Sequence, residues 1–207
     1  MAVSAEQVKK LREMSGAPMM ECKKALEEVQ GDLDGAFTVL RKRGQATAAK
    51  KAGRIATEGL IGHYIHPGSK VAVIVEVNCE SDFVARTEEF QDLAHDIAMQ
   101  ICATDPKFIR KEEVTEDVLD REKSILREQA AASGKPEAVL DRIVEGRLSK
   151  FYEENCLYDQ HFIKDPAGTQ TMRELIESKI AKFGENITVR RFSRFKVGEG
   201  LSKLSAE

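Results

Sequence analysis

The stretch GLIGHYIHPGSKVAVIVEV, residues 59–77, decides the fold because its pattern is that of two β-strands joined by a tight turn. Its second half, VAVIVEV (71–77), is apolar and rich in β-branched residues, which suits a pleated sheet. Pro67 and Gly68 separate the two runs, and both residue types favour turns. The sequence therefore predicts a β-hairpin.

A polar segment with an unexpected aromatic residue continues from the hairpin in EVNCESDFVAR (76–86). We expect the strand to end in a polar turn over residues 78–82. Asp82 and Phe83 then place an acid beside a large aromatic side chain, and Val84 follows. From the residues alone, Phe83 is compatible with a capping contact under the turn and with a group that projects toward a partner.

Three helices are expected upstream of the hairpin, over residues 4–14, 19–30 and 32–44. Ser4 and Asp32 are suitable N-caps, and Gly44 is expected to end the third helix. The expected inward positions recur at spacings of three and four: Val8, Leu11, Met19, Cys22, Leu26, Val29, Leu33, Ala36, Phe37 and Leu40. A module this small is marginal as a domain, which favours a docking surface over an active site.

Four helices and one strand are expected downstream of the hairpin. The first helix spans residues 88–103, with Phe90, Leu93, Ala94, Ile97 and Ile101 inward. Two long helical patterns, 112–134 and 136–157, are separated only by a Gly and Pro joint, which predicts an antiparallel helical hairpin. A helix over 171–184 and a strand over 185–200 complete the pattern.

The predicted fold class is α+β, with a small antiparallel sheet packed against helices and a protruding helical hairpin. The predicted divisions are a three-helix docking module over 1–44 and a basic linker over 45–56. An α+β core over 57–200 follows and contains the helical hairpin at about 112–156. A tail over 201–207 ends the chain.

Composition argues against nucleic acid as the main partner. The 207 residues carry a net charge of −3, no tryptophan and few aromatic side chains. Six basic residues and no acidic ones lie between Arg41 and Arg54, and a solvated linker or helix explains them as well as a phosphate-binding strip does. No secretory signal or membrane span is evident, which favours a cytoplasmic protein.

Motifs for catalysis are missing from the sequence. It contains no phosphate-binding loop, no dinucleotide fingerprint and no nucleophile elbow. Four cysteines, at positions 22, 79, 102 and 156, are too far apart to form a zinc or disulfide framework. His63 and His66 would point to opposite faces of a strand, so we expect no metal site. The sequence favours a binding protein that is not an enzyme and has no cofactor.

Two stretches resemble the signatures of one family. LREMSGAPMMECKKAL (11–26) and EVNCESDFVAR (76–86) resemble those of elongation factor Ts, the exchange factor for the translational GTPase elongation factor Tu. Ser15 and Ser81 stand where threonine is more usual, and both substitutions keep a hydroxyl. The match continues in order over nearly the whole chain.

The resemblance implies a function in translation elongation, with elongation factor Tu as the partner. It implies that Asp82, Phe83 and Val84, flanked by Cys79, Glu80 and Ser81, enter the partner's nucleotide domain near magnesium. The resemblance also implies docking through Arg12, Met19 and Met20, with His66 as a further contact. Because the chain has room for one core subdomain, it resembles the short members, which are associated with homodimers that bind two partner molecules.

Two other function classes remain open. The first 44 residues resemble a ubiquitin-associated-type bundle, which would suit a general interaction module. The alternative is an RNA-binding adaptor that uses Arg41–Arg54 together with Arg190, Arg191 and Arg194.

Overall fold

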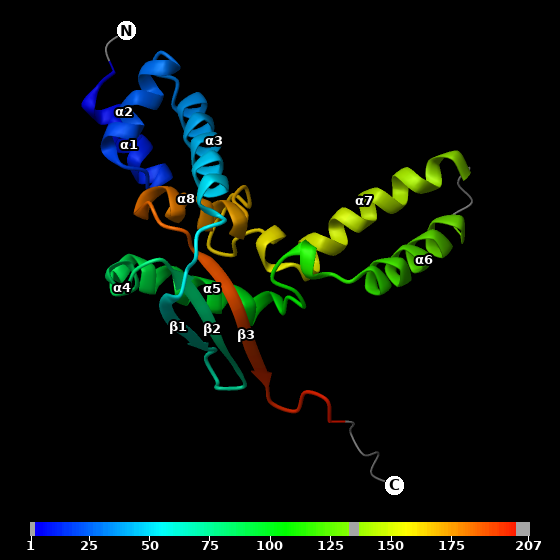
Figure 1. The fold of residues 1–207 in the computed structure, drawn as a ribbon. Helices are drawn as coiled ribbons and strands as arrows, with labels where there is room; N and C mark the ends of the chain where they lie inside the picture. Colours follow the sequence, from blue (N-terminus) through cyan, green and yellow to red (C-terminus); the bar gives the residue numbers. More distant parts are fainter. Residues whose placement is uncertain (1–2, 133–136, 202–207) are drawn as a thin grey trace. The chain divides into compact units, whose positions relative to one another are not determined.

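The structure, a computed structural model, describes residues 3–132 and 137–201. The chain divides into two compact units. The first comprises Met1–Gly62, Val75–Asp96 and Arg173–Arg190, and the second comprises His63–Ile74, Ile97–Met172 and Arg191–Glu207. Helices and one small sheet build these units, which confirms the predicted α+β class (Figure 1).

The sheet contains three strands in the order β1-β2-β3. They are β1 (Glu58–Ile65), β2 (Val71–Cys79) and β3 (Thr188–Lys196). The predicted hairpin is confirmed, since the amide of His66 donates to the carbonyl of Val71 at 2.9 Å and closes the β1–β2 turn. A Cβ added to Gly62 would lie 2.9 Å from the Cβ of Ala94, so this strand can approach helix α5 (Glu88–Thr104) only without a side chain.

The N-terminal module has the three expected helices, α1 (Ala5–Ser15), α2 (Met19–Glu28) and α3 (Leu33–Lys51). Ser4 begins α1 with a capping box, because its side chain and that of Gln7 each accept the other's backbone amide. Buried side chains from all three helices form one core: Val8, Leu11, Cys22, Ala25, Leu26 and Ala36.

The third helix does not end at Gly44, so that prediction is wrong. Helix α3 runs on to Lys51 and takes up more than half of the segment expected as a linker. The continuation QATAAKK is rich in good helix formers, and their propensity outweighs the cost of one interior glycine. Gly44 is buried within α3, and a Cβ there would lie 3.9 Å from the carbonyl oxygen of Glu177 in helix α8 (Met172–Phe183).

Two other local expectations are corrected. Met19 does not point into the core, because it opens α2 on its exposed side. The polar turn expected over residues 78–82 begins later, since β2 continues through Asn78 and Cys79, and both are buried. The side-chain nitrogen of Asn78 donates to the carbonyl of Glu58 at 3.2 Å, while its side-chain oxygen is buried without a hydrogen-bond partner among the described residues.

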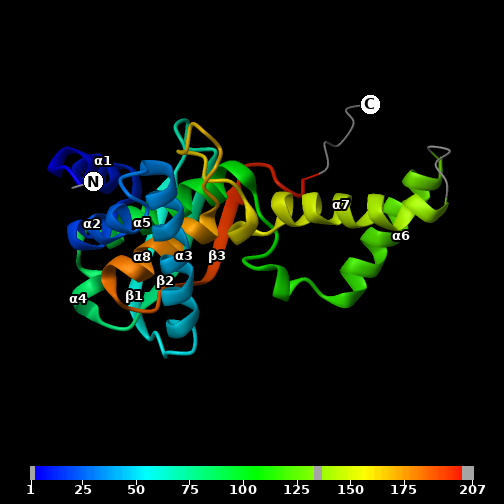
Figure 2. The same cartoon turned by 90° about the horizontal axis from the view of Figure 1, so that it is seen from above.

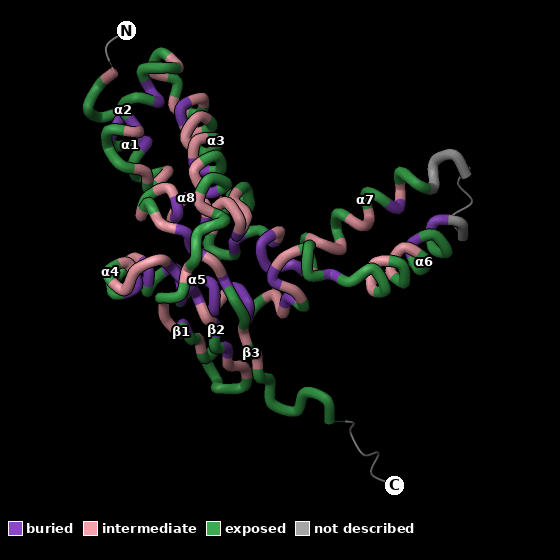
Figure 3. Tube along the Cα trace, in the orientation of Figure 1, coloured by how far each residue is buried: buried purple, intermediate pink, exposed green. Residues whose placement is uncertain are grey.

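Helix α5 supplies many of the buried apolar residues, and Figure 3 shows buried positions concentrated along it and along β2. The five residues expected to point inward are all buried: Phe90, Leu93, Ala94, Ile97 and Ile101. This prediction is confirmed, because the apolar residues recur at helical spacing throughout. Asp105 ends the helix with a φ of 48°.

The predicted helical hairpin is present in the second unit. Helices α6 (Glu116–Ala132) and α7 (Glu137–Asn155) lie side by side in both views (Figures 1 and 2). Helix α6 begins later than predicted, because Lys111–Glu113 forms a separate 3₁₀ turn, η1. A second such turn, η2 (Leu157–Asp159), follows α7. The expected joint at residues 133–136 and the tail from residue 202 lie outside the described residues.

Candidate functional site

Phe83 is the most exposed large aromatic side chain of the described residues, at 81%. It lies on a single helical turn, α4 (Asp82–Ala85), between β2 and α5. Ser81 caps this turn by accepting the amide of Val84 at 3.4 Å, and Ala85 is buried beneath it. The backbone around Phe83 is therefore ordered at both ends while its ring faces outward.

Asp82 presents a carboxylate next to the ring. Its side chain is partly exposed and pairs with Arg86 across one helical turn, with the Arg86 Nη2 to Asp82 Oδ2 distance at 2.8 Å. Such exposed pairs contribute at most about 1 kcal/mol to stability. The carboxylate can therefore exchange Arg86 for groups of a partner at little cost.

A distant glutamate braces the segment just before this turn. One carboxylate oxygen of Glu185, between α8 and β3, accepts the backbone amides of Glu80 at 3.1 Å and Ser81 at 3.0 Å. The other oxygen accepts the hydroxyl of Ser81 at 2.6 Å. Sequence reasoning missed Glu185, because a contact across 104 positions leaves no local pattern.

Cys79 closes β2 as a buried thiol. Its sulfur donates to the carbonyl of Ser81 at 3.1 Å. Burial, with a smaller contribution from the charge of Glu185, raises the pKa of the Cys79 thiol to about 11. Cys79 is thus a packing residue, whereas Asp82, Phe83 and Arg86 of this signature present their side chains outward.

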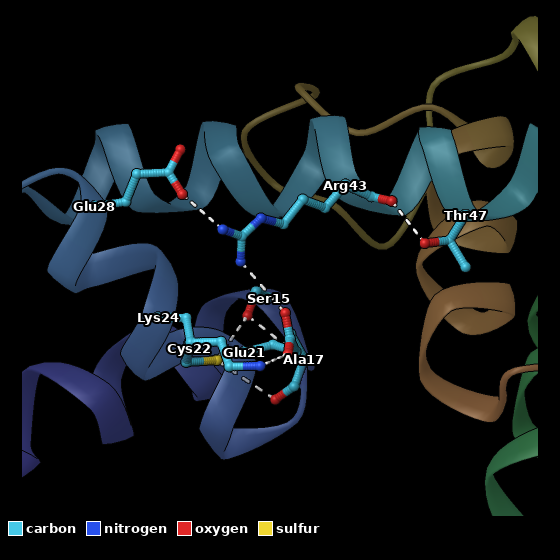
Figure 4. Close-up of polar contacts among 8 residues, drawn as sticks. All are labelled: Ser15, Ala17, Glu21, Cys22, Lys24, Glu28, Arg43 and Thr47. Carbon is cyan, nitrogen blue, oxygen red and sulfur yellow. Dashed lines mark hydrogen bonds and ion pairs between the residues drawn. The ribbon is translucent and has the colours of Figure 1, made fainter.

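The other signature forms the corner between α1 and α2. Gly16 ends α1 with a φ of 65°, and the hydroxyl of Ser15 donates to the carbonyl of Leu11 at 2.7 Å. The sulfur of Cys22 approaches the Ser15 hydroxyl at 3.7 Å and donates to the Ala17 carbonyl at 3.5 Å (Figure 4). These contacts fix the turn that leads into α2.

Methionines cover the outside of this corner. Met19 and Met20 are 53% and 61% exposed, and both Met14 and Arg12 are also exposed. Only one of the two adjacent methionines was expected to face outward, and Met14 was not among the predicted contacts. Long, flexible methionine side chains suit contact with an apolar partner surface.

Much of the basic charge of α3 is paired within the first unit. Arg43 lies 2.6 Å from Glu28 and 3.3 Å from Glu21 (Figure 4). Arg41 pairs with Glu174 of α8, and the ammonium of Lys51 donates to the carbonyl of Gly184. These contacts tie α3 to its neighbours and reduce the charge available for phosphates.

His66 is exposed in the β1–β2 turn, where its Nδ1 lies 3.4 Å from the hydroxyl of Tyr64. Over the described ranges, no three His, Cys, Asp or Glu side chains gather in a way that could hold a metal ion. Within the same residues no helix is both long and apolar enough to cross a membrane. The outward features are thus an anion beside an aromatic ring and a methionine-rich corner, which suit binding.

Comparison with known proteins identifies relatives of the chain. Residues 3–169 match the family model described as Elongation factor TS. The chain is 61% identical to the elongation factor Ts of Solibacter usitatus over 197 residues, covering 95% of this chain and 92% of that protein. It is 57% identical to that of Koribacter versatilis over 212 residues, covering 100% of this chain and 96% of the relative. It is also 57% identical to that of Caldanaerobacter subterraneus, covering 97% and 100%.

Proposed function

This chain belongs to the elongation factor Ts family, and we propose that Asp82 and Phe83 act as the wedge through which it releases GDP from elongation factor Tu. Its function is guanine-nucleotide exchange in translation elongation, as for the family. The observation that carries the wedge proposal is the 81% exposure of Phe83 on an ordered turn. Burial of this ring in a partner contributes roughly 1.5–3 kcal/mol.

The wedge acts by stabilising a partner conformation that binds nucleotide poorly. Magnesium and phosphate-loop donors hold the nucleotide in such GTPases, so a displaced magnesium ion weakens binding. Asp82 supplies a carboxylate beside the ring, suited to compete for groups around magnesium. By linkage, nucleotide must weaken the complex by the same factor as the complex weakens nucleotide. No covalent bond is made or broken, so the protein is an exchange factor and not an enzyme.

The methionine-rich corner is the docking surface in this proposal. Arg12, Met19 and Met20 are exposed at the junction of α1 and α2, whose turn is held by the contacts of Ser15 and Cys22. Docking through this corner supplies affinity, while the wedge perturbs the nucleotide site. His66 is a weaker candidate for partner contact.

Because elongation takes place in the cytoplasm, we propose a cytoplasmic location.

The RNA-binding alternative is less well supported. Arg41, Arg43 and Lys51 have partners within the first unit. On β3, Arg190 pairs with Glu76 at 2.8 Å, and Arg194 lies near Asp105 at 3.6 Å. A general helical interaction module would have no use for the second signature and its exposed Phe83.

The test is release of a fluorescent GDP from elongation factor Tu. The unaltered protein should accelerate release at micromolar concentration, and Phe83→Ala and Asp82→Ala should slow exchange by about 10-fold or more while weakening complex formation less. Ile55→Ala is the control, because Ile55 is 83% exposed and lies outside both signatures. If the unaltered protein does not accelerate GDP release, the exchange function is wrong. If the two substitutions lower the exchange rate and the affinity for the partner equally, Asp82 and Phe83 only contribute binding energy.

We also propose that two chains associate into a homodimer that binds two molecules of elongation factor Tu. The alignments cover 92–100% of these relatives, so they are similar in length to this chain. Ile65, Ile74 and Phe195, from three strands of the sheet, are exposed in the second unit. A second copy that covers this apolar surface would form an isologous contact.

A further inference from the structure

We propose that Glu185 is a positioning residue for exchange, because its carboxylate holds the segment from which the wedge projects. This inference rests on the proposed wedge function of Asp82 and Phe83. Glu185 itself lies outside both signatures and outside the matched residues 3–169. It acts through Ser81 and does not need to touch the partner.

The first argument is the number and type of bonds at this carboxylate. Glu185 accepts two backbone amides and one hydroxyl, from Glu80 and Ser81, at 2.6–3.1 Å. Hydrogen bonds to an ionised acceptor are about twice as strong as neutral ones. The Ser81 hydroxyl oxygen in turn accepts the amide of Val84, next to Phe83. The chain of contacts therefore leads from Glu185 directly to the turn that carries the ring.

The second argument is that the contact is reciprocal. One carboxylate oxygen of Glu80 accepts the backbone amide of Asn186 at 2.6 Å. Each segment thus caps the backbone of the other, Glu80–Ser81 from one side and Glu185–Asn186 from the other. The main-chain amide of Asn186 holds the pKa of the Glu80 carboxyl below its usual range, so this acceptor stays ionised at neutral pH.

The third argument is that the same contacts reach the end of the docking module. The side-chain amide of Asn186 donates to the carbonyl of Arg54 at 2.8 Å. The guanidinium of Arg54 lies 3.4 Å from the second carboxylate oxygen of Glu80. Arg54 follows α3, whose other end belongs to the docking module. Glu185 is therefore placed to hold the wedge in a fixed position relative to Arg54, in the segment that follows the docking module.

The experiment uses the absence of tryptophan from the chain. Phe83→Trp introduces a single indole, and its time-resolved anisotropy in the full-length protein without partner reports how ordered this position is. Glu185→Ala should increase the fast motion of the indole. Glu185→Gln should restore order, because the amide oxygen can accept both backbone amides and the amide nitrogen can donate to the Ser81 hydroxyl.

Exchange is then measured with Phe83 intact. Glu185→Ala should lower the exchange rate per unit concentration about 10-fold, since only the fraction of molecules with an ordered wedge is competent. Glu185→Gln should recover most of it. Asp165→Ala is the matched control, because that carboxylate also accepts backbone amides and a hydroxyl, within the second unit. It should leave both readouts unchanged.

The outcomes separate this inference from the function on which it rests. An ordered indole in Glu185→Ala overturns the positioning role, whatever the exchange rate. A mobile indole with normal exchange in Glu185→Ala overturns its relevance to exchange. Normal exchange in Phe83→Ala overturns the wedge itself, independently of Glu185. If Glu185→Ala does not fold, Glu185→Asp, shorter by one methylene, gives the same comparison.

Discussion

Phe83 is exposed although a phenylalanine ring of this size would stabilise a protein core. Its neighbours explain how the exposure is maintained: Ala85 is buried on the same turn, and Ser81 caps that turn through Val84. A four-residue helix cannot turn both Ala85 and Phe83 toward the core, because the two residues are about 200° apart around the helix axis. The local backbone thus places the small residue in the interior and leaves the aromatic ring exposed to solvent.

The neighbouring thiol gives a prediction at the residue scale. Cys79 is buried, and its pKa is raised to about 11. At pH 8 only about one molecule in a thousand carries the thiolate, and the thiolate is the reactive species. Cys79 in the native protein should therefore resist a thiol reagent at pH 8, with the labelling rate rising as pH approaches 11. Mass spectrometry of labelled peptides checks this.

The control for that measurement is the unfolded protein. In concentrated urea all four cysteines should react quickly, because their ordinary pKa values and access to solvent return. Rapid labelling of native Cys79 would show that the end of β2 opens readily. It would also contradict the ordered turn on which the proposed wedge depends.

At the level of elements, the predictable parts of the fold were those with a repeating apolar pattern. Helix α5 is the clearest case, since Phe90, Leu93 and Ile97 recur at helical spacing and are all buried. The hairpin of β1 and β2 was predictable from its turn residues. Single-residue signals were less reliable: Gly44 suggested a helix end, but helix propensity on both sides and packing against α8 outweighed it.

In the candidate site, too, residues in a local sequence pattern could be predicted and residues in long-range contacts could not. Asp82 and Phe83 could be identified from a contiguous signature, and the structure places both on one exposed turn. Glu185 could not be identified, because its contacts with Ser81 depend on how distant elements meet. Met19 was assigned to the core because it shares a helical face with Cys22, yet it lies at the first position of α2, where the helix faces the solvent.

The continuity of α3 gives a prediction at the element scale. Gly44→Ala should stabilise the protein by about 0.5–1 kcal/mol, because alanine loses less backbone entropy than glycine in a helix interior. The added Cβ would meet the Glu177 carbonyl oxygen at 3.9 Å, an ordinary contact, so no strain should offset the gain. Urea denaturation with constant slope measures the change.

Gly62→Ala is the matched comparison, with the opposite sign expected. Its added Cβ would lie 2.8 Å from the carbonyl oxygen of Ala94, so β1 or α5 would have to shift. The substitution should destabilise the protein by about 1–3 kcal/mol. A loss of stability in Gly44→Ala would contradict a regular helix through that position.

At the largest scale, the described residues expose several apolar side chains on the strands of the sheet. Ile65, Ile74 and Phe195 come from three different strands and are all exposed in the second unit. One face of an antiparallel sheet commonly packs on the core, and exposed apolar groups on a sheet mark an interaction site when they form a contiguous patch. A second copy is the occupant we propose, because the described residues contain only one small sheet with which to build a core subdomain.

The prediction at this scale concerns mass in solution. Light scattering should report about twice the 23.1 kDa of one chain, and Phe195→Asp should shift the protein toward monomer by placing a charge in the proposed contact. Ile125→Asp is the control, because Ile125 is also exposed but lies on α6 of the helical hairpin, so its mass should not change. An unaltered protein that is monomeric and still accelerates GDP release would show that exchange needs only one subunit, and the 2:2 assembly would be wrong.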